Sequence, residues 1–318
     1  MRLDRLDSLR DDEAWLAQTL DSPAARFVPL WRSRNLLASG DNGEVAVYLE
    51  PGELDRLDSV QPPTLLGTDG KRFFFAVSIN DAQRETILSQ RPQARFVDLR
   101  RASMNMDAKH AGVLAYAKAL HYWQHRHGFC GACGSPNLLR SSGHKLVCSN
   151  DECARQTFPR IDPAIIVLVT HGDACLLGHN AAWPAKRYST LAGFVEPGES
   201  LEDAVVREVY EEARVRLTGM RYVSSQPWPF PASAMCGFYA EAENRDCEST
   251  DEMEEVLWLN VDELKSAILD GSVRLPPPVS IAFQLIADWY RGRSGGALED
   301  VVAEAKERAG AKVLTFRD

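Results

Sequence analysis

Four of the seven cysteines lie in one short stretch, and their spacing constrains the fold of this 318-residue chain more than any other feature. Two residues separate Cys130 from Cys133, and four residues separate Cys148 from Cys153. This pattern is typical of two hairpin-like loops that hold one tetrahedral Zn²⁺ through four thiolates. Because four protein ligands leave no open coordination position, we expect a structural zinc ion that stabilises a small domain and takes no part in catalysis.

Disulfide bonds are the alternative use of these cysteines, and they require an oxidising compartment. The N-terminal residues MRLDRLDSLRDDEAW lack the apolar core of a signal peptide, and no run of about 18 apolar residues predicts a membrane span. We therefore expect a cytoplasmic protein without a membrane partner. His144 lies between the two cysteine pairs and could replace one ligand, but four thiolates already complete the site.

The patterning on either side of the cysteines predicts an α+β protein. Before them, short apolar runs such as VAVYL and FFFAVSI alternate with turn residues, which predicts strands. From about Met104 to His127, apolar residues recur at three- and four-residue steps and predict a helix that leads into the cysteines. After them, PAIIVLVT and ACLLGH predict two paired strands joined by the turn HGDA.

These patterns divide the chain into four parts, and no internal repeat is apparent. We predict an N-terminal α/β-type domain with a linking helix at 1–125, a small four-cysteine zinc ribbon at 126–160, a further domain at 161–295, and a C-terminal tail without an assigned role at 296–318.

The segment LAGFVEPGESLEDAVVREVYEEARV, residues 191–215, combines a glycine-containing entry with an acidic helix. Ser200 is expected to cap this helix with support from Asp203, and Gly198 lets the chain turn into it. An apolar stripe predicts that the helix packs on a sheet. The stripe consists of Leu201, Val205, Val209 and Ala213.

Three carboxylates stand on one face of that helix, because Glu208, Glu211 and Glu212 occupy positions i, i+3 and i+4, within about 6 Å of one another. Such carboxylates repel one another unless a cation such as Mg²⁺ or Mn²⁺ binds them and bridges to substrate phosphates. The net charge of −9 argues against a dedicated binder of duplex nucleic acid, so we expect phosphates to be handled through metal ions. The alternative is a solvated acidic helix face on which Arg207 pairs with Glu211.

The spacing of the whole segment favours the metal site. The series from Gly193 through Glu199 to Arg207, followed by the three glutamates and Val215, resembles the Nudix box of hydrolases that cleave nucleoside diphosphates linked to another moiety. The sequence departs from the family at Arg214, where the box has glycine. Glycine usually supplies the left-handed turn that ends a helix, so Arg214 would cost roughly 1 kcal/mol there or adopt another conformation.

The segment SQPWPFPAS, residues 225–233, resembles the signature of the NADH pyrophosphatase branch of this family. Its prolines predict a stiff, extended wall, and Trp228 and Phe230 offer flat faces for a base or a nicotinamide ring, with stacking worth about 1–3 kcal/mol per base. The alternative is a rigid hairpin linker whose aromatic side chains belong to the core. TFPRIDPAIIVLV and LPPPVSIAFQLI resemble the same branch, so the resemblance covers roughly residues 120–290.

The resemblance implies a C-terminal Nudix α/β/α sandwich with a mixed sheet and a defined set of site residues. The implied catalytic residues are Glu211, Glu208, Glu212 and Arg207. The implied ligands of Mg²⁺ or Mn²⁺ are Glu199, Glu208, Glu211 and Glu212, with Glu252 favoured over Glu255 as a ligand outside the box. The implied substrate-binding residues are Phe158, Phe194, Ser225, Gln226, Trp228, Phe230, Ser233 and Ala282.

The implied activity is metal-dependent hydrolysis of the pyrophosphate bond of NADH or NAD⁺, which gives AMP and the reduced or oxidised nicotinamide mononucleotide. The same bond occurs in NAD-capped RNA 5′ ends, so cap removal is also implied, and the family suggests a homodimer. One alternative is a Nudix hydrolase of ADP-ribose or dinucleoside polyphosphates. The other is a catalytically inactive zinc-ribbon interaction protein.

Overall fold

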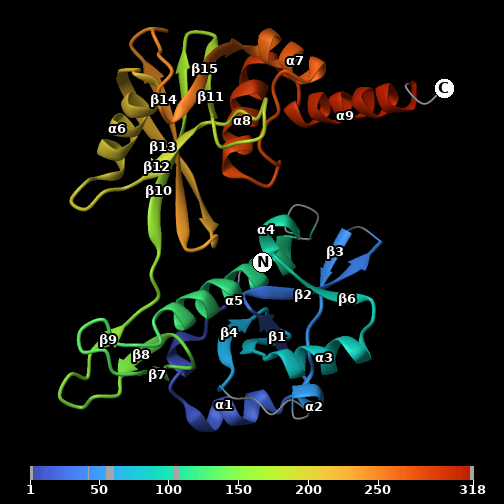
Figure 1. Ribbon diagram of the computed structural model, residues 1–318, viewed down its shortest axis with the longest axis vertical. Coiled ribbons are helices and arrows are strands. Elements are labelled where there is room, and N and C mark those ends of the chain that lie inside the picture. The colour runs from blue at the N-terminus through green and yellow to red at the C-terminus, as the bar shows by residue number, and fades with distance from the viewer. Residues whose placement is uncertain (1–2, 42, 55–60, 103–105, 107, 316–318) are drawn as a thin grey trace. The chain divides into compact units, whose positions relative to one another are not determined.

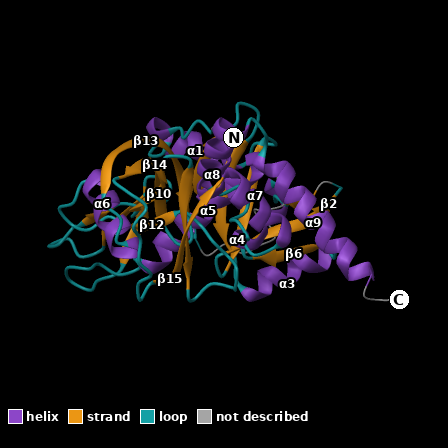
Figure 2. Ribbon diagram, turned by 90° about the horizontal axis from the view of Figure 1, so that it is seen from above, coloured by secondary structure: helices purple, strands orange, loops and turns teal. Residues whose placement is uncertain are grey.

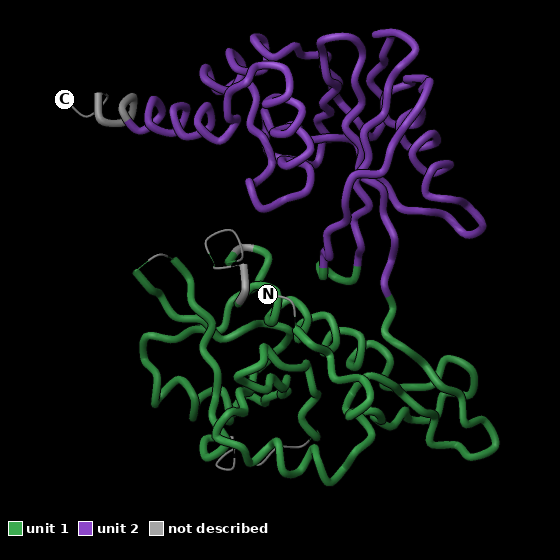
Figure 3. The backbone as a smooth tube through the Cα atoms, turned by 180° about the vertical axis from the view of Figure 1, so that it is seen from behind, with its two compact units in different colours: residues 1–160, 229–232 green, residues 161–228, 233–318 purple. Residues whose placement is uncertain are grey.

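The computed structural model describes residues 3–315 except 42, 55–60, 103–105 and 107. The chain folds into two compact units, which Figure 3 distinguishes by colour. The first unit comprises Met1–Arg160 together with Pro229–Ala232, and the second comprises Ile161–Trp228 and Ser233–Asp318. Among the described residues, no helix has the length and apolar character needed to span a bilayer.

The first unit is built on a six-stranded sheet with the order β3-β2-β1-β5-β4, to which β6 adds by pairing with β2. Its strands are β1 (Ala25–Trp31), β2 (Arg34–Gly40), β3 (Gly43–Ala46), β4 (Thr64–Thr68), β5 (Phe73–Ser78) and β6 (Ala94–Val97). Its helices are the short η1 (Asp7–Leu9), α1 (Glu13–Leu20), α2 (Pro51–Leu54), α3 (Asp81–Gln90), α4 (Leu99–Ala102) and α5 (Ala108–Arg126).

Alternation of side chains across the strands gives this sheet two apolar faces. Phe27 of β1 faces a core that includes α1 and α3, whereas its neighbour Val28 faces a second core that includes α5. Helix α5 corresponds to the helix predicted before the cysteines, and the predicted starting residue Met104 lies outside the described residues.

The zinc ribbon, in the first unit, is a small antiparallel sheet with the order β7-β8-β9. Its strands are β7 (Asn137–Arg140), β8 (Lys145–Cys148) and β9 (Gln156–Thr157). Phe158, one of the implied substrate-binding residues, directly follows the end of β9.

The second unit has a mixed six-stranded sheet with the order β13-β14-β10-β11-β15, and β12 pairs with β10. Its strands are β10 (Asp162–His171), β11 (Ala174–Asn180), β12 (Leu191–Phe194), β13 (Leu217–Trp228), β14 (Ser233–Ala242) and β15 (Met253–Asn260). Its helices are α6 (Leu201–Ala213), α7 (Val261–Asp270), α8 (Ile281–Ser294) and α9 (Leu298–Thr315). The predicted pair of strands with its turn at Gly172–Asp173 forms β10 and β11.

Helices cover both faces of this sheet, as the predicted α/β/α sandwich requires. Helix α6 and helix α8 lie on opposite sides of β10 and β12 in two views (Figures 1 and 2). The residues of β10 alternate accordingly: Ile165 and Val167 join the core with α6, whereas Ile166 and Leu168 join the core with α8. A strand buried on both faces needs a continuous apolar run, which PAIIVLV supplies.

The predicted C-terminal tail at 296–318 contains helix α9. Leu298 and Val301 are buried in the same core as α7 and α8. In Figure 1 the helix runs from this core toward the C-terminus. Before α9, Gly295 ends α8 in a left-handed turn, after which the chain resumes a helix.

The two large sheets share one strand order, which corrects the expectation that the chain has no internal repeat. The central strands β1 and β10 each pair antiparallel with the next strand in sequence and parallel with a later strand, β5 or β14. The later strand pairs antiparallel with the edge strand β4 or β13, and the other edge is completed by β3 or β15. The repeat therefore lies in strand pairing, which a one-dimensional pattern does not record.

Candidate active site

The four predicted zinc ligands meet at one point of the zinc ribbon. The sulfur atoms of Cys130, Cys133, Cys148 and Cys153 all lie within 4.8 Å of one another, and the Sγ–Sγ distances include 3.4 Å and 3.8 Å. A tetrahedron with Zn–S bonds of about 2.3 Å has edges of about 3.8 Å, whereas a disulfide bond would bring two sulfurs to about 2.05 Å. The cysteines are free thiols, so their arrangement fits a structural Zn²⁺ and excludes the disulfide alternative here.

His144 lies away from this cluster. Its Nε2 lies 2.6 Å from the carbonyl oxygen of Leu65, and its burial lowers its pKa to about 4. The expectation that His144 is unnecessary as a ligand agrees with this position.

Helix α6 begins and packs as its sequence predicts. Ser200 accepts a hydrogen bond from the backbone N–H of Asp203, whose side chain accepts one in return from the N–H of Ser200, which forms a complete capping box. Val205, Val209 and Ala213 are fully buried against the sheet. The helix is thereby fixed at its start and along one face, which also fixes the direction of its charged side chains.

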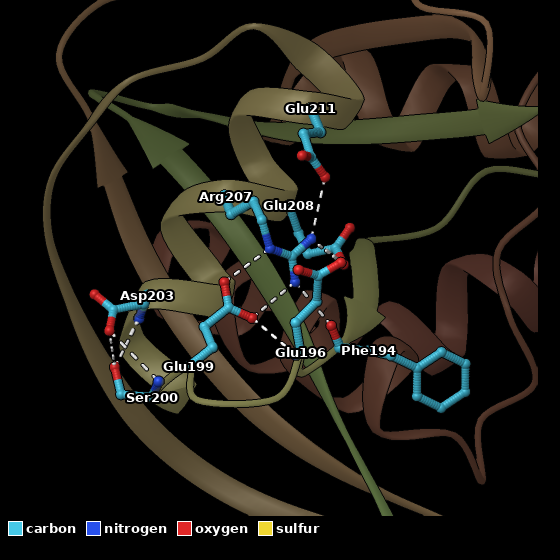
Figure 4. A network of polar contacts seen from close by, with 8 residues as sticks. All are labelled: Phe194, Glu196, Glu199, Ser200, Asp203, Arg207, Glu208 and Glu211. Atoms are coloured by element: carbon cyan, nitrogen blue, oxygen red, sulfur yellow. Dashed lines mark hydrogen bonds and ion pairs between the residues drawn. The ribbon is translucent and has the colours of Figure 1, made fainter.

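Arg207 occupies the centre of the box (Figure 4). Its guanidinium makes two hydrogen bonds to Glu199, of 2.7 and 2.9 Å, and single bonds to Glu208 at 2.8 Å and Glu211 at 3.1 Å. It also donates to the carbonyl oxygen of Phe194 at 2.8 Å. The hydrogen bonds from Arg207 lower the pKa of Glu199 to about 2. The contact between Arg207 and Glu211, on which the alternative of a solvated acidic helix face depends, is the longest of these hydrogen bonds.

The charges of the three helix carboxylates interact, but the three side chains differ in their exposure to solvent. The side chain of Glu211 is 57% exposed, that of Glu208 is 13% exposed, and Glu212 is 1% exposed. The backbone N–H of Ala192 donates to Glu212 at 3.2 Å. Burial, followed by the charges of Glu252 and Glu208, raises the pKa of Glu212 to about 8. A buried carboxyl among other carboxylates is a group that a cation would ionise.

Glycine is required at position 193 because of Glu208. A Cβ atom at Gly193 would lie 1.8 Å from Cδ of Glu208, which is far inside contact distance. Strand β12 pairs with the central strand β10 at this point, with Gly193 opposite Ile165, so the backbone cannot move away easily. The carboxylate of Glu208 therefore lies directly on the strand backbone, and burial raises its pKa as well.

Of the two glutamates outside the box, Glu252 is the one electrostatically coupled to it. The charge of Glu252 raises the pKa of both Glu212 and Glu208. Glu255 instead accepts a hydrogen bond from the hydroxyl of Tyr188, whose own pKa rises to about 12 through burial and this bond.

Within the described part of the chain, the four cysteines are the one group of three or more ligand side chains already close enough to hold a metal ion. The box carboxylates are instead distributed around Arg207 and along the strand. Their chemistry, with several carboxylates and two of raised pKa, nevertheless fits a hard divalent cation.

The SQPWPFPAS segment forms a β-hairpin. Ser225–Trp228 end the edge strand β13 and pair with Ser233–Cys236 of β14, and residues 229–232 between them group with the first unit. An edge strand tolerates Pro227 because proline lacks the backbone donor that a central strand needs. Trp228 is half-buried, and Phe230 packs beside the core that includes α5, so the hairpin alternative describes the backbone correctly.

Gln226 uses its amide within the second unit. Its Nε2 donates to the carbonyl oxygen of Val279 at 2.8 Å, and its Oε1 accepts from the N–H of Ile281 at 2.9 Å. These bonds tie β13 to the start of α8, where Ala282 is buried in the first turn. The predicted hydrogen bonds from Gln226 to a substrate are therefore replaced, in this structure, by bonds to the chain itself.

The remaining predicted substrate residues are divided between the units. Phe194 is 59% exposed at the end of β12, and its ring points away from the Arg207 cluster (Figure 4). Phe158 is 61% exposed in the first unit. Ser225 is exposed on β13, and Ser233 is buried at the start of β14.

Arg214 takes the conformation that the family's glycine would take. Its backbone has φ 60° and ψ 17°, in the left-handed region, and its N–H donates to the carbonyl oxygen of Tyr210 at 2.9 Å. Its guanidinium lies over the Tyr210 ring, 5.3 Å from the ring centroid. The turn geometry is thus retained, and the Arg214 side chain contacts an aromatic ring.

Sequence reasoning missed contributions from the main chain and from Tyr188. The N–H of Ala192 donates to Glu212, and the carbonyl oxygen of Phe194 accepts from Arg207. Because nearly every residue has these backbone groups, the sequence does not indicate which of them contact the site. Tyr188 lies in an irregular segment whose contact with Glu255 depends on strand pairing.

The mixed sheet, the capped acidic helix and the zinc ribbon define a protein whose second unit presents carboxylates for a divalent cation. Three family models match the chain. They are a NUDIX domain over residues 160–276, an NADH pyrophosphatase-like rudimentary NUDIX domain over 24–123, and an NADH pyrophosphatase zinc ribbon domain over 125–155.

Curated relatives agree with these models. The NAD-capped RNA hydrolase NudC of Stutzerimonas stutzeri is 40% identical over 212 residues, which cover 66% of this chain and 73% of that protein. The NudC protein of Pseudomonas putida is 44% identical over 191 residues, covering 60% of this chain and 65% of that protein. The NAD-capped RNA hydrolase NUDT12 of Macaca fascicularis is 35% identical over 236 residues, covering 70% of this chain, which spans 51% of that relative's length. The chain therefore belongs to the Nudix hydrolases, in the branch with an NADH pyrophosphatase-like domain and zinc ribbon.

Proposed function

We propose that this protein hydrolyses the pyrophosphate bond of NADH and NAD⁺, giving AMP and the corresponding nicotinamide mononucleotide, and that it removes NAD caps from RNA 5′ ends. The observation that carries the proposal is the cluster of carboxylates around β12 and α6. In this cluster, the pKa of buried Glu212 is raised to about 8, in part by the charges of Glu252 and Glu208. Relatives named as NAD-capped RNA hydrolases support the choice of substrate.

Glu208, Glu212 and Glu252 are the residues that would hold Mg²⁺ or Mn²⁺, with Glu199 and Glu211 as further box carboxylates. Glu255 is the weaker candidate because Tyr188 already donates to it. A divalent ion bound there supplies neutralisation of the phosphate oxygens and a water molecule of lowered pKa. Arg207 keeps Glu199, Glu208 and Glu211 in fixed positions through its hydrogen bonds. Glu211, the most exposed carboxylate of the helix, is the candidate to accept the proton of the attacking water.

We assign recognition of the dinucleotide to the aromatic and backbone groups that the family resemblance implies. Phe158, Phe194, Trp228 and Phe230 are the candidates to flank a base or nicotinamide ring, and Ser225, Ser233 and Ala282 to make polar contacts. We assign Gln226 the role of positioning the start of α8, because its amide already forms hydrogen bonds with the backbone of Val279 and Ile281.

The remaining parts of the proposal concern the whole protein. We keep a division into an N-terminal domain at 1–125, a zinc ribbon at 126–160 and a Nudix domain from 161 onward, with α9 added to the last. Four reduced thiolates suit a reducing compartment such as the cytoplasm. Homodimerisation is proposed from the family and is tested by measuring the molar mass in solution.

Product analysis tests the proposed activity. The purified protein is incubated with Mg²⁺ or Mn²⁺ and, separately, with NADH, NAD⁺, ADP-ribose, a diadenosine polyphosphate and NAD-capped RNA, and the products are separated by chromatography. We expect AMP with a nicotinamide mononucleotide from NADH and NAD⁺, and a 5′-monophosphate end from the capped RNA. Preference for ADP-ribose would keep the metal site and overturn the assigned substrate. Absence of turnover on every substrate would revive a binding role for the zinc ribbon.

A further inference from the structure

The second unit contains a pocket of about 650 Å³ that none of the proposed catalytic residues lines. Its walls come from β10, β13, β14 and the C-terminal half of α8, and include Thr170, Arg221, Tyr239 and Arg293. Thr170 lies on β10 about 17 Å beyond Ile165, the strand position opposite Gly193 of the box, at about 3.3 Å per residue. Helix α8 also covers the face of the sheet opposite to α6. The pocket is therefore separate from the carboxylate site within the same unit.

Two guanidinium groups at this pocket form no ion pair with a carboxylate among the described residues. They belong to Arg221 and Arg293, and both side chains are exposed. Of the two acidic side chains of the same pocket, only Asp288 forms an ion pair among the described residues. Asp288 pairs with Arg291 at 3.1 Å, and Glu241 accepts a hydrogen bond from the hydroxyl of Thr170 at 2.9 Å. Two guanidinium groups and one carboxylate, that of Glu241, therefore line the pocket without an ion pair among the described residues, which leaves one excess positive charge.

Aromatic side chains hold one of these groups in place. Cζ of Arg221 lies 4.5 Å from the centroid of the Tyr239 ring, and the hydroxyl of Tyr239 donates to the carbonyl oxygen of Leu285 at 2.9 Å. A guanidinium that stacks on a ring keeps its edge N–H groups available for an acceptor. Trp289, which also lines the pocket, is buried, and its indole N–H has no acceptor in the described structure.

We propose that this pocket is a second anion site, which binds the phosphate group of a nucleotide-sized ligand. Guanidinium groups bind phosphate through charge-assisted hydrogen bonds, and the volume falls within the range of about 300–1,000 Å³ that is usual for small-molecule sites. The phosphate belongs either to a free nucleoside monophosphate or to the phosphodiester chain of an RNA. The proposal does not rest on the proposed function, because it uses none of the catalytic residues.

Equilibrium binding tests the site with two probes, 5′-AMP and a short oligoribonucleotide with a 5′-hydroxyl end, in the absence of Mg²⁺ and Mn²⁺. Calorimetry gives the affinity and the number of equivalents for the wild-type chain and for the double variant Arg221→Gln with Arg293→Gln. The matched control is Arg216→Gln, since Arg216 also lies over a tyrosine ring, at 5.7 Å from Tyr210, but outside the pocket. All three proteins keep the carboxylate site unchanged. A difference in affinity or in the number of equivalents between them therefore measures binding at the pocket.

We expect the double variant to lose one binding event or to bind about tenfold more weakly, and the control to behave as the wild type does. A loss confined to 5′-AMP identifies a free nucleotide as the ligand, and a loss confined to the oligoribonucleotide identifies an RNA chain. Wild-type binding of both probes by the double variant overturns the proposal. If the double variant does not fold, as judged by circular dichroism, the single variant Arg293→Gln at an exposed position provides the same comparison. Failure of the proposed function is seen separately, as absent NAD⁺ turnover by the wild-type protein.

Discussion

The two large sheets of this protein have the same strand order, but the long helices that pack on them carry different chemistry. Helix α5, on the sheet of the first unit, contains no aspartate or glutamate, whereas α6, on the sheet of the second unit, contains three glutamates and an arginine in its last two turns. The buried polar groups differ in the same way. Lys118 and His121 on α5 contact the carbonyl oxygen of Ser33 and the hydroxyls of Ser33 and Ser78, which are neutral partners.

Glu212 on α6 has a single backbone donor at 3.2 Å and lies among other carboxylates. Burial lowers the pKa of His121 to about 3 and raises that of Glu212 to about 8, so both groups favour their neutral forms. The charged neighbours of His121 are Lys118 and His125, whereas those of Glu212 are carboxylates, whose mutual repulsion a bound cation would relieve. The comparison teaches that two sheets with the same strand order can differ in function, and that the side chains of the helix packed on each sheet decide whether it supports catalysis.

The largest expected effect is that of Glu212→Gln on turnover. Because the substitution removes a charge that the metal site needs and keeps the shape of the side chain, we expect NAD⁺ turnover to fall by at least about a hundredfold with the fold intact. Steady-state kinetics and circular dichroism measure the two effects. The matched variant on the other helix is His121→Gln, which should lower thermal stability and leave turnover nearly unchanged. Near-normal turnover by Glu212→Gln would remove this residue from the metal site and with it the contrast between the helices.

The same residue predicts how stability depends on pH. The pKa of Glu212 in the folded protein, about 8, lies above the ordinary glutamate value of 4.5, so folding disfavours the charged form. In protein that retains zinc but lacks Mg²⁺ and Mn²⁺, this group destabilises the fold progressively as the pH rises from about 4.5 to 8, by roughly 4 kcal/mol. Urea unfolding between pH 5 and 8 should show this decline in the wild type and a flatter profile in Glu212→Gln. The pKa of Glu199 is lowered to about 2, so its protonation reduces the stability of the fold only as the pH falls from about 4.5 towards 2.

Gly193→Ala tests the close contact between strand and helix. The added Cβ collides with the carboxylate of Glu208, so we expect turnover to fall by about ten- to a hundredfold, together with a lower melting temperature. The control is Gly219→Ala in β13 of the same unit, where a Cβ meets nothing within 4 Å. If both variants retain wild-type turnover, Glu208 has no fixed role and the box does not depend on β12.

The smallest expected effect is that of Arg214→Gly at the end of α6. Arg214 has a left-handed backbone, so glycine should raise the free energy of unfolding by about 1 kcal/mol while turnover stays unchanged. Arg216→Gly, two residues later and outside the left-handed region, should not stabilise the protein. Chemical denaturation of both variants measures the free energy of unfolding. A stabilisation at both positions would mean that the gain comes from lost charge and not from backbone strain.

Local features of the site were predictable from sequence, and the environments of its residues were not. The four cysteine positions, the cap at Ser200 and the apolar stripe of α6 follow from spacing along a single segment. The unequal burial of Glu208, Glu211 and Glu212 depends on where β12 and the loop before β15 lie relative to the helix. The amide of Gln226 was assigned to a substrate, but its partners are more than fifty residues away in sequence, at the start of α8.

The sequence alone determined the four-cysteine cluster, the acidic helix and the family resemblance, because each depends on residues within one or two turns or loops, where spacing fixes geometry. Only the tertiary structure decided that the two sheets share a strand order, that residues 296–318 contain a helix, and that Glu212 is buried with a raised pKa. Strand partners and burial are set by contacts between distant segments, and the free energy of those contacts depends on the whole fold.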